Sequence, residues 1–135
     1  MIFTFCYFKF PDSESLHATI LPNRIEDDME NLIASYLVDS GGASLKSHIE
    51  YLKECLRALG SPSTYEADIS SNSYSAKIRN DGVRVSFLYD EIQSIKVSRT
   101  KLQDITKAWI LFLEREPIAG YIETMYIAET IPNSV

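Results

Sequence analysis

The spacing of apolar residues changes twice along this chain, and these changes constrain the fold more than any other feature. Apolar residues recur at helical spacing between residues 23 and 60, alternate with polar residues between 65 and 89, and return to helical spacing between 100 and 114. Because a helix repeats every 3.6 residues and a strand every two, each change marks a new kind of element. Helices segregated from a run of antiparallel strands predict an α+β fold.

Three amphipathic helices are predicted from caps and apolar stripes. Asn23 with Glu26 resembles a capping box for the first helix, Ser44 begins the second, and Thr100 with Gln103 begins the third. The short connection between the first two favours an antiparallel helical hairpin. The stripes, helix by helix, consist of Ile25, Met29, Leu32, Ile33, Tyr36 and Leu37; of Leu45, Ile49, Leu52, Leu56 and Leu59; and of Leu102, Ile105, Trp109, Phe112 and Leu113.

The predicted strands flank and separate these helices. Residues 2–10 are apolar on both faces, which suits a strand covered on both sides or near the centre of a sheet. Residues 16–21 and 92–97 add shorter extended segments, and Asn80-Asp81-Gly82 is a strong hairpin turn. The last strand runs from Tyr121 to Ile131. The whole chain, residues 1–135, is predicted to be a single domain of order β-α-α-β-β-β-α-β, a mainly antiparallel sheet with three helices covering mainly one face.

Net charge is concentrated in one stretch of the sequence. The chain carries a formal charge of −6. Between Asp12 and Asp39 there are seven acidic residues and one base, Arg24, whereas the remaining acids and bases balance. Such a field repels nucleic acid and membrane surfaces and attracts basic partners. We therefore expect no direct nucleic-acid binding and no membrane association.

Motifs for catalysis or for cofactors are absent from the sequence. Cys6 and Cys55 form no CxxC or zinc spacing, and apolar surroundings predict buried, inert thiols. His17 and His48 belong to no metal pattern, and no glycine-rich phosphate loop or GxSxG is present. We therefore expect no enzymatic activity, no catalytic residues, no cofactor and no metal site.

Two surfaces have alternative interpretations. Acids in the first helical turn either complement the helix dipole in water or present a docking surface to a basic partner. The bases Lys77, Arg79 and Arg84 either form a solvated strand face or bind phosphate.

The last strand places aromatic residues on both of its faces, one of which is expected to remain open to a partner. The residues predicted to bind a partner are Asp12, Glu14, Glu26, Asp27, Asp28, Glu30, Tyr121, Glu123 and Tyr126.

The segment around the predicted third helix resembles a known group of proteins. Residues 101–117, KLQDITKAWILFLEREP, follow an alternating strand pair and a polar turn. They are similar to the l..i...W..FL...P pattern of bacterial immunity proteins in contact-dependent growth inhibition and related polymorphic toxin systems. The resemblance implies a cytoplasmic inhibitor that binds the C-terminal toxin domain of a cognate protein, often a nuclease with a basic cleft. It assigns no site residues, because these families share none.

Two other functions remain open at this stage. One is a regulatory or adaptor module that associates with itself or with a partner through its aromatic strands. The other is a small enzyme whose site is not apparent from sequence. The first ten residues, MIFTFCYFKF, lack the basic start and small-residue cleavage site of a signal peptide, which predicts a structural strand and a cytoplasmic protein.

Overall fold

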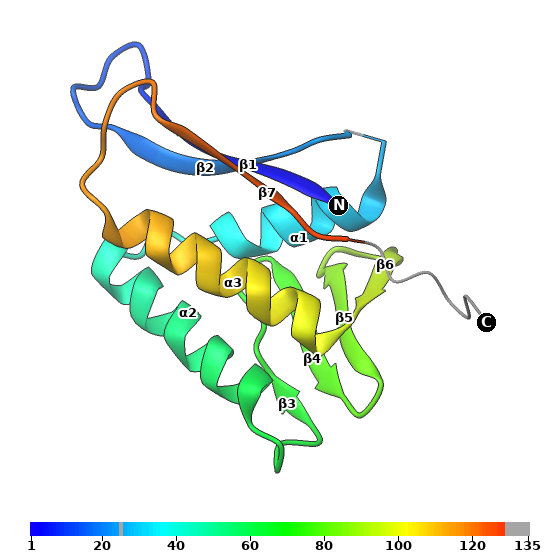
Figure 1. Ribbon diagram of the computed structural model, residues 1–135. Helices are drawn as coiled ribbons and strands as arrows, with labels where there is room; N and C mark the ends of the chain where they lie inside the picture. The colour runs from blue at the N-terminus through cyan, green and yellow to red at the C-terminus, as the bar shows by residue number, and fades with distance from the viewer. Residues whose placement is uncertain (25, 129–135) are drawn as a thin grey trace.

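The computed structural model describes residues 1–24 and 26–128, and within them the chain forms three helices and seven strands (Figure 1). The α+β class predicted from the hydrophobic periods is confirmed, as is the order of the main elements. The elements, in order, are β1 (Ile2–Phe8), β2 (His17–Pro22), α1 (Asp28–Val38), α2 (Leu45–Gly60), β3 (Ala67–Asp68), β4 (Tyr74–Arg79), β5 (Gly82–Phe87), β6 (Asp90–Val97), α3 (Arg99–Glu114) and β7 (Ile122–Tyr126). Ile25 and the predicted end of the last strand, residues 129–131, lie outside the described residues.

The strands form two antiparallel sheets, where the sequence pattern predicted one. The three-stranded sheet has the order β2-β1-β7, and the four-stranded sheet has the order β3-β4-β5-β6. In Figure 1 the three-stranded sheet lies above the helices and the four-stranded sheet lies to their right. The single-sheet prediction was wrong because α3 carries the chain out of the second sheet before β7 pairs with β1. The pairing joins strands at opposite ends of the chain, and no local pattern encodes it.

The predicted hairpin of the first two helices is also absent, because α2 packs against α3. The two helices lie side by side in Figure 1, whereas α1 lies beneath β2 and reaches the four-stranded sheet. Arg99, at the start of α3, fixes this pairing. Its guanidinium donates hydrogen bonds of 2.5–3.2 Å to the main-chain carbonyls of Ala58, Leu59, Ser61 and Thr64. The last carbonyls of a helix lack partners within it, so one side chain of α3 caps the end of α2.

The helix starts differ from two of the three predicted caps. Ser44 caps α2 as predicted, accepting a hydrogen bond of 3.2 Å from the Ser47 amide. The cap of α1 is Asp27, because the Asn23 amide still pairs with the carbonyl of Ile2 at the end of the sheet. Ser98 caps α3 directly after β6. The observed caps of α1 and α3 lie a few residues from the predicted ones. Several nearby residues can cap a helix, so the first residue of a helix is hard to predict from sequence.

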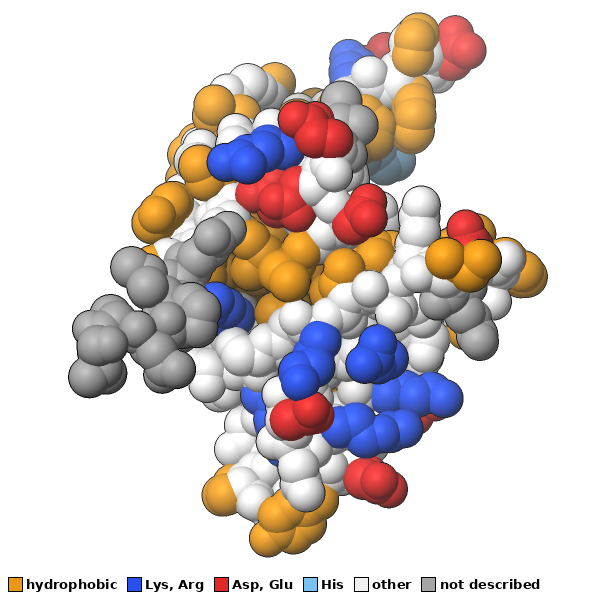
Figure 2. All heavy atoms as spheres, turned by 90° about the vertical axis from the view of Figure 1, so that its right-hand side faces the viewer, with side chains coloured by type: hydrophobic (Ala, Val, Ile, Leu, Met, Phe, Trp, Pro, Cys, Tyr) orange, Lys and Arg blue, Asp and Glu red, His pale blue; other side chains and the backbone are white. Residues whose placement is uncertain are grey.

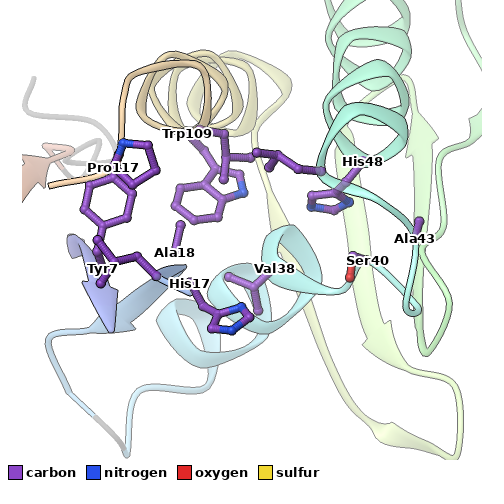
Figure 3. A pocket seen from close by; sticks show the side chains of 12 residues that line it. Tyr7, His17, Ala18, Val38, Ser40, Ala43, His48, Trp109 and Pro117 are labelled. Atoms are coloured by element: carbon purple, nitrogen blue, oxygen red, sulfur yellow. The ribbon is translucent and has the colours of Figure 1, made fainter. Parts of the chain in front are cut away.

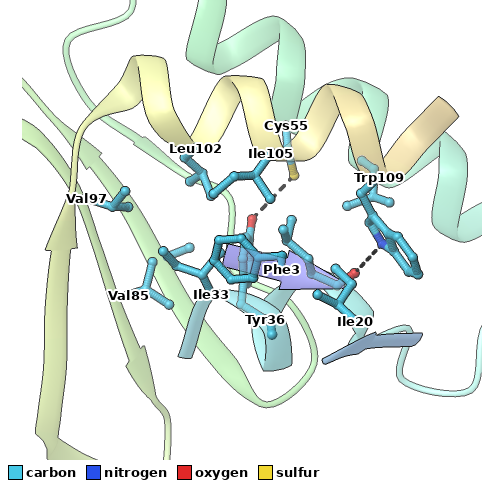
Figure 4. Packing of buried hydrophobic residues seen from close by; sticks show 14 of the residues in the cluster. Phe3, Ile20, Ile33, Tyr36, Cys55, Val85, Val97, Leu102, Ile105 and Trp109 are labelled. Atoms are coloured by element: carbon cyan, nitrogen blue, oxygen red, sulfur yellow. Dashed lines mark hydrogen bonds between the residues drawn. The ribbon is translucent and has the colours of Figure 1, made fainter. Parts of the chain in front are cut away.

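One hydrophobic core joins the two sheets and the three helices (Figure 4). All five residues of the predicted α3 stripe are buried, and Trp109 is 1% exposed. The rings of Trp109 and Phe112 lie 5.3 and 5.6 Å from the ring of Phe5 on β1, centroid to centroid. Phe3 and Phe5 point to the same side of their sheet, so the inner face of β1 is filled by the aromatic side of α3.

The predicted hairpin turn at Asn80-Asp81-Gly82 is confirmed between β4 and β5. Gly82 pairs with Arg79 and has a φ of 144°, which side chains of L residues rarely adopt. A Cβ on Gly82 would lie 2.8 Å from the carbonyl oxygen of Val97 on β6. A side chain at this position would therefore be strained and would collide with the main chain of β6.

Candidate functional site

The acidic stretch of the sequence does not form one surface in the fold. Asp12 and Glu14 lie in the connection between β1 and β2, and Glu26 and Asp28 follow the far end of β2; all four are exposed. The six residues of β2 separate the two groups, a length of about 20 Å at roughly 3.3 Å per residue. We call these groups the two acidic ends. A partner must reach along the whole strand to contact both.

Two of the predicted acidic residues have structural roles instead. Glu30 is 3% exposed, so its prediction as a docking residue was wrong. Its carboxylate accepts hydrogen bonds from the main-chain amides of Ile2, at 2.8 Å, and of Arg24, at 2.9 Å. Asp27 accepts from the Glu30 amide as the cap of α1. Glu30 lies at the end of the three-stranded sheet, where the amides at the start of β1 and after β2 need a partner.

Of the three residues near the last strand that were predicted to bind a partner, Tyr121 and Glu123 contact each other and Tyr126 is exposed. The Tyr121 hydroxyl donates a hydrogen bond of 2.6 Å to the Glu123 carboxylate, and the Arg115 guanidinium lies 3.4 Å from the centre of the Tyr121 ring. Arg115 also approaches Glu123 at 3.5 Å. This cluster fastens β7 to the end of α3. Tyr126 instead is 70% exposed.

The feature that sequence reasoning missed is the outer face of the three-stranded sheet. Residues that pair directly across strands project to the same face, and α1 and α3 cover the opposite one. Among the described residues no helix covers the outer face, and its members are all partly or fully exposed. None of them is Asp, Glu, Lys or Arg. They are Ile2, Thr4, Cys6 and Phe8 of β1, His17, Thr19 and Leu21 of β2, and Ile122, Thr124 and Tyr126 of β7.

An uncharged open face is unusual for an antiparallel sheet, which normally alternates apolar residues inside with polar residues outside. Leu21 is 50% exposed and Ile122 is 59% exposed. Burial raises the pKa of the Cys6 thiol, so this side chain is also neutral near pH 7. The apolar residues on both faces of segment 2–10 were the available signal. It correctly indicated the centre of a sheet, and β1 is the central strand.

A cavity of about 240 Å³ brings together the two histidines and several aromatic residues (Figure 3). Tyr7, His17, His48 and Trp109 line it from β1, β2, α2 and α3. The polar atoms of two of them are already used. His48 Nε2 lies 3.0 Å from the Leu37 carbonyl oxygen, and Trp109 Nε1 donates to the same oxygen at 3.1 Å. Burial lowers the pKa of His48, and the hydrogen bond to Leu37 partly opposes this shift.

Nothing in the described part of the chain assembles three or more potential metal ligands. Cys55 is buried, and its pKa is raised by burial. It lies 3.6 Å from the Tyr36 hydroxyl, which donates to the Ile69 carbonyl at 2.6 Å. This cluster holds α1 and α2 to the loop that precedes β4. No helix in residues 1–24 or 26–128 has the length and apolar character required to cross a membrane.

The fold and the outer face together define a small α+β domain that offers an open sheet surface. The chain belongs to the family of unknown function DUF5376, whose model matches residues 1–126. It is similar to the uncharacterized protein PM0491 of Pasteurella multocida (strain Pm70), with 33% identity over 100 residues that cover 72% of this chain and 77% of that protein. No solved structure matches the chain.

Proposed function

We propose that this protein is a non-catalytic inhibitor that binds a partner protein on the outer face of its three-stranded sheet. The single observation that carries the proposal is the lack of any Asp, Glu, Lys or Arg on that exposed face. Apolar surface left in water is unfavourable, and contiguous exposed patches of this kind mark interaction sites. Covering Ile122, Leu21 and Tyr126 would remove the most exposed of these apolar side chains from water.

The acidic ends complete the surface and indicate the chemistry of the partner. The outer face alone measures about 10 by 20 Å, from strands 4.8 Å apart and about 3.3 Å per residue. A stable complex buries about 800 Å² on each partner, so residues beyond the face must contribute. The two acidic ends flank β2 and supply a charged rim. The partner that fits has an apolar centre and a basic margin.

A toxin domain with a basic, nucleic-acid-binding cleft is the partner that fits this description best. Together with the resemblance of residues 101–117, it favours a cytoplasmic immunity protein of a contact-dependent inhibition system. Opposite charge raises association rates above the neutral level of about 10⁵–10⁶ M⁻¹s⁻¹, and an inhibitor must act before the toxin reaches its substrate. The apolar face would then provide slow dissociation.

The test compares one substitution on the outer face with a matched one elsewhere. Ile122→Lys places a charge on the outer face beside Cys6, at a residue that is 59% exposed. Leu45→Lys makes the same change at a residue that is 54% exposed at the start of α2. Neighbouring genes are searched for a toxin domain, and its binding to each variant is measured by calorimetry. We expect Ile122→Lys to abolish binding and Leu45→Lys to preserve it. Equal binding by both variants would remove the outer face from the interface.

Cys6 provides a second, independent measurement on the native chain. It is the partly exposed cysteine of the outer face, whereas Cys55 is 3% exposed. Alkylation followed by mass spectrometry therefore reports Cys6 alone in the folded protein. We expect the bound partner to slow its modification at least tenfold. An unchanged rate in the complex would show that the partner binds elsewhere.

The same observation supports one alternative, an adaptor module that associates with a second copy of itself. Two uncharged sheet faces can pack against each other without burying a charge, as in a sheet-on-sheet interface. Sedimentation of the chain alone distinguishes the two functions. A dimer that Ile122→Lys dissociates favours the adaptor, and a monomer that binds the toxin domain favours the inhibitor.

A further inference from the structure

The exposed face of the four-stranded sheet carries a row of cations that the strand register brings together. Lys77 on β4 pairs directly with Arg84 on β5, and Arg84 pairs with Lys96 on β6. Arg79 lies two residues from Lys77 on the same face, and all four side chains are exposed. We call these four residues the cationic face. Figure 2 shows Lys and Arg side chains gathered over this sheet.

Like charges directly opposite each other weaken a sheet, and the acidic neighbours compensate only part of this row. Lys96 forms an ion pair of 2.7 Å with Asp81, and Arg84 donates a hydrogen bond of 3.1 Å to the Ser94 hydroxyl. Asp68 on β3 lies opposite Lys77 and is bound to Ser70. Lys77 and Arg79 have no ion pair among the described residues. Among the side chains that the structure describes, four cations therefore face Asp68 and Asp81, in a chain whose net charge is −6.

We propose that the cationic face is a second docking site, which binds an acidic helix of a partner protein. The spacing of the row supports a helix. Neighbouring strands lie about 4.8 Å apart, so Lys77, Arg84 and Lys96 span about 10 Å. Carboxylates at positions i, i+4 and i+7 of a helix span about 10.5 Å at 1.5 Å per residue. A helix that crosses the strands places one carboxylate over each cation.

Nucleic acid fits the cationic face less well for two reasons. Single strands are held by stacking bases on aromatic rings, and the neighbouring row on this face is Ser75, Ser86 and Ser94. A duplex needs a longer basic surface, because it carries a phosphate charge about every 1.7 Å of its axis. Asp68 and Asp81 also border the row and would repel phosphates. An acidic helix needs only the three matched positions.

The experiment uses the full chain and a labelled helical peptide that carries Glu at i, i+4 and i+7 on one side. A second peptide has the same composition with Glu residues distributed around the helix, and a 20-nucleotide oligo-dT strand is the nucleic-acid probe. Fluorescence anisotropy at low salt measures binding to the wild type and to two double variants. Lys77→Gln with Arg84→Gln removes two charges of the row. Lys46→Gln with Lys107→Gln removes two exposed charges from α2 and α3.

We expect saturable binding of the striped peptide that weakens about tenfold in the first double variant and less than twofold in the second. Added salt should weaken it further, because the contacts are exposed charges. Thermal unfolding of both variants verifies that they remain folded. The proposal is overturned if the striped peptide does not bind, if both peptides bind equally, or if both variants lose affinity alike. Tighter binding of oligo-dT through Lys77 and Arg84 would overturn it in favour of nucleic acid.

Discussion

The indole N–H of Trp109 donates a hydrogen bond of 3.1 Å to the main-chain carbonyl of Leu37, and this bond joins α3 to the last turn of α1 (Figure 4). Leu37 is one of the last residues of α1, so its carbonyl has no partner within the helix. His48 on α2 reaches the same oxygen. Three helices that are separated in sequence therefore meet at one main-chain atom.

Replacing Trp109 should be among the most destabilising single changes in this protein. We expect Trp109→Ala to lower the free energy of unfolding by about 3–5 kcal/mol, because it leaves a large cavity beneath β1. Trp109→Phe should cost less, since it retains aromatic packing while removing the donor to Leu37. Equilibrium unfolding in urea measures both. A native emission maximum typical of a water-exposed indole would contradict the assignment, because the side chain is 1% exposed.

His48 should make stability depend on pH in the mildly acidic range. Burial lowers its pKa in the folded state below the ordinary value of about 6.5, so the unfolded chain binds the proton first. The contribution of neutral His48 is therefore present above about pH 6.5 and is lost as the pH falls through the folded-state pKa. In unfolding experiments between pH 7.5 and 5, His48→Gln should show a shallower decline than the wild type. His17→Gln, at an exposed position, serves as the control, and equal slopes for His48→Gln and the wild type would contradict the prediction.

Glu30 should matter for folding and Glu26 should not, although both belong to the same acidic run. Removing the Glu30 carboxylate leaves the amides of Ile2 and Arg24 without their acceptor. We expect Glu30→Ala to destabilise the protein by about 1–3 kcal/mol in total, because two partly buried donors lose their acceptor. Glu26→Ala, at an exposed position, should stay within about 0.5 kcal/mol of the wild type. Chemical unfolding of the two variants side by side would refute this if their midpoints coincide.

Removing the central charge of the cationic face should stabilise the fold. Arg84 stands between Lys77 and Lys96, so Arg84→Thr relieves two like-charge contacts and introduces a residue that favours strands. We expect a net rise of about 0.5 kcal/mol in the free energy of unfolding. The loss of the exposed hydrogen bond to Ser94 offsets part of the gain from removing the like charges. The gain should shrink as salt is added, because exposed charges are screened. A thermal midpoint that falls at low salt would show that the row is not strained.

The prediction of individual elements succeeded where the deciding forces act between near neighbours in the sequence. The stripe of Leu102, Ile105 and Trp109 specifies a helix with one buried side, and Gly82 favours a turn conformation that other residues rarely adopt. The cap positions of α1 and α3 were missed by a few residues. At Asn23 the competing partner was the carbonyl of Ile2, which is distant in sequence.

The candidate sites depended on pairings that no local pattern contains. The outer face exists because β7 joins β1, and the cationic face exists because the register places Lys77, Arg84 and Lys96 in one row. The acidic run looked continuous in sequence, yet β2 separates its exposed members and Glu30 is buried at the end of the three-stranded sheet. A sum of charges along the sequence therefore does not tell which of those residues share a surface in the fold.

The sequence by itself determined which segments are helices, which are strands and where the tightest hairpin turns, because periodicity, caps and glycine geometry act over a few residues. The tertiary structure decided how the strands divide into two sheets, which helices pair, and which side chains share a face. Those outcomes rest on contacts between residues far apart in the chain, such as Trp109 with Leu37, whose free energy appears only when the core closes.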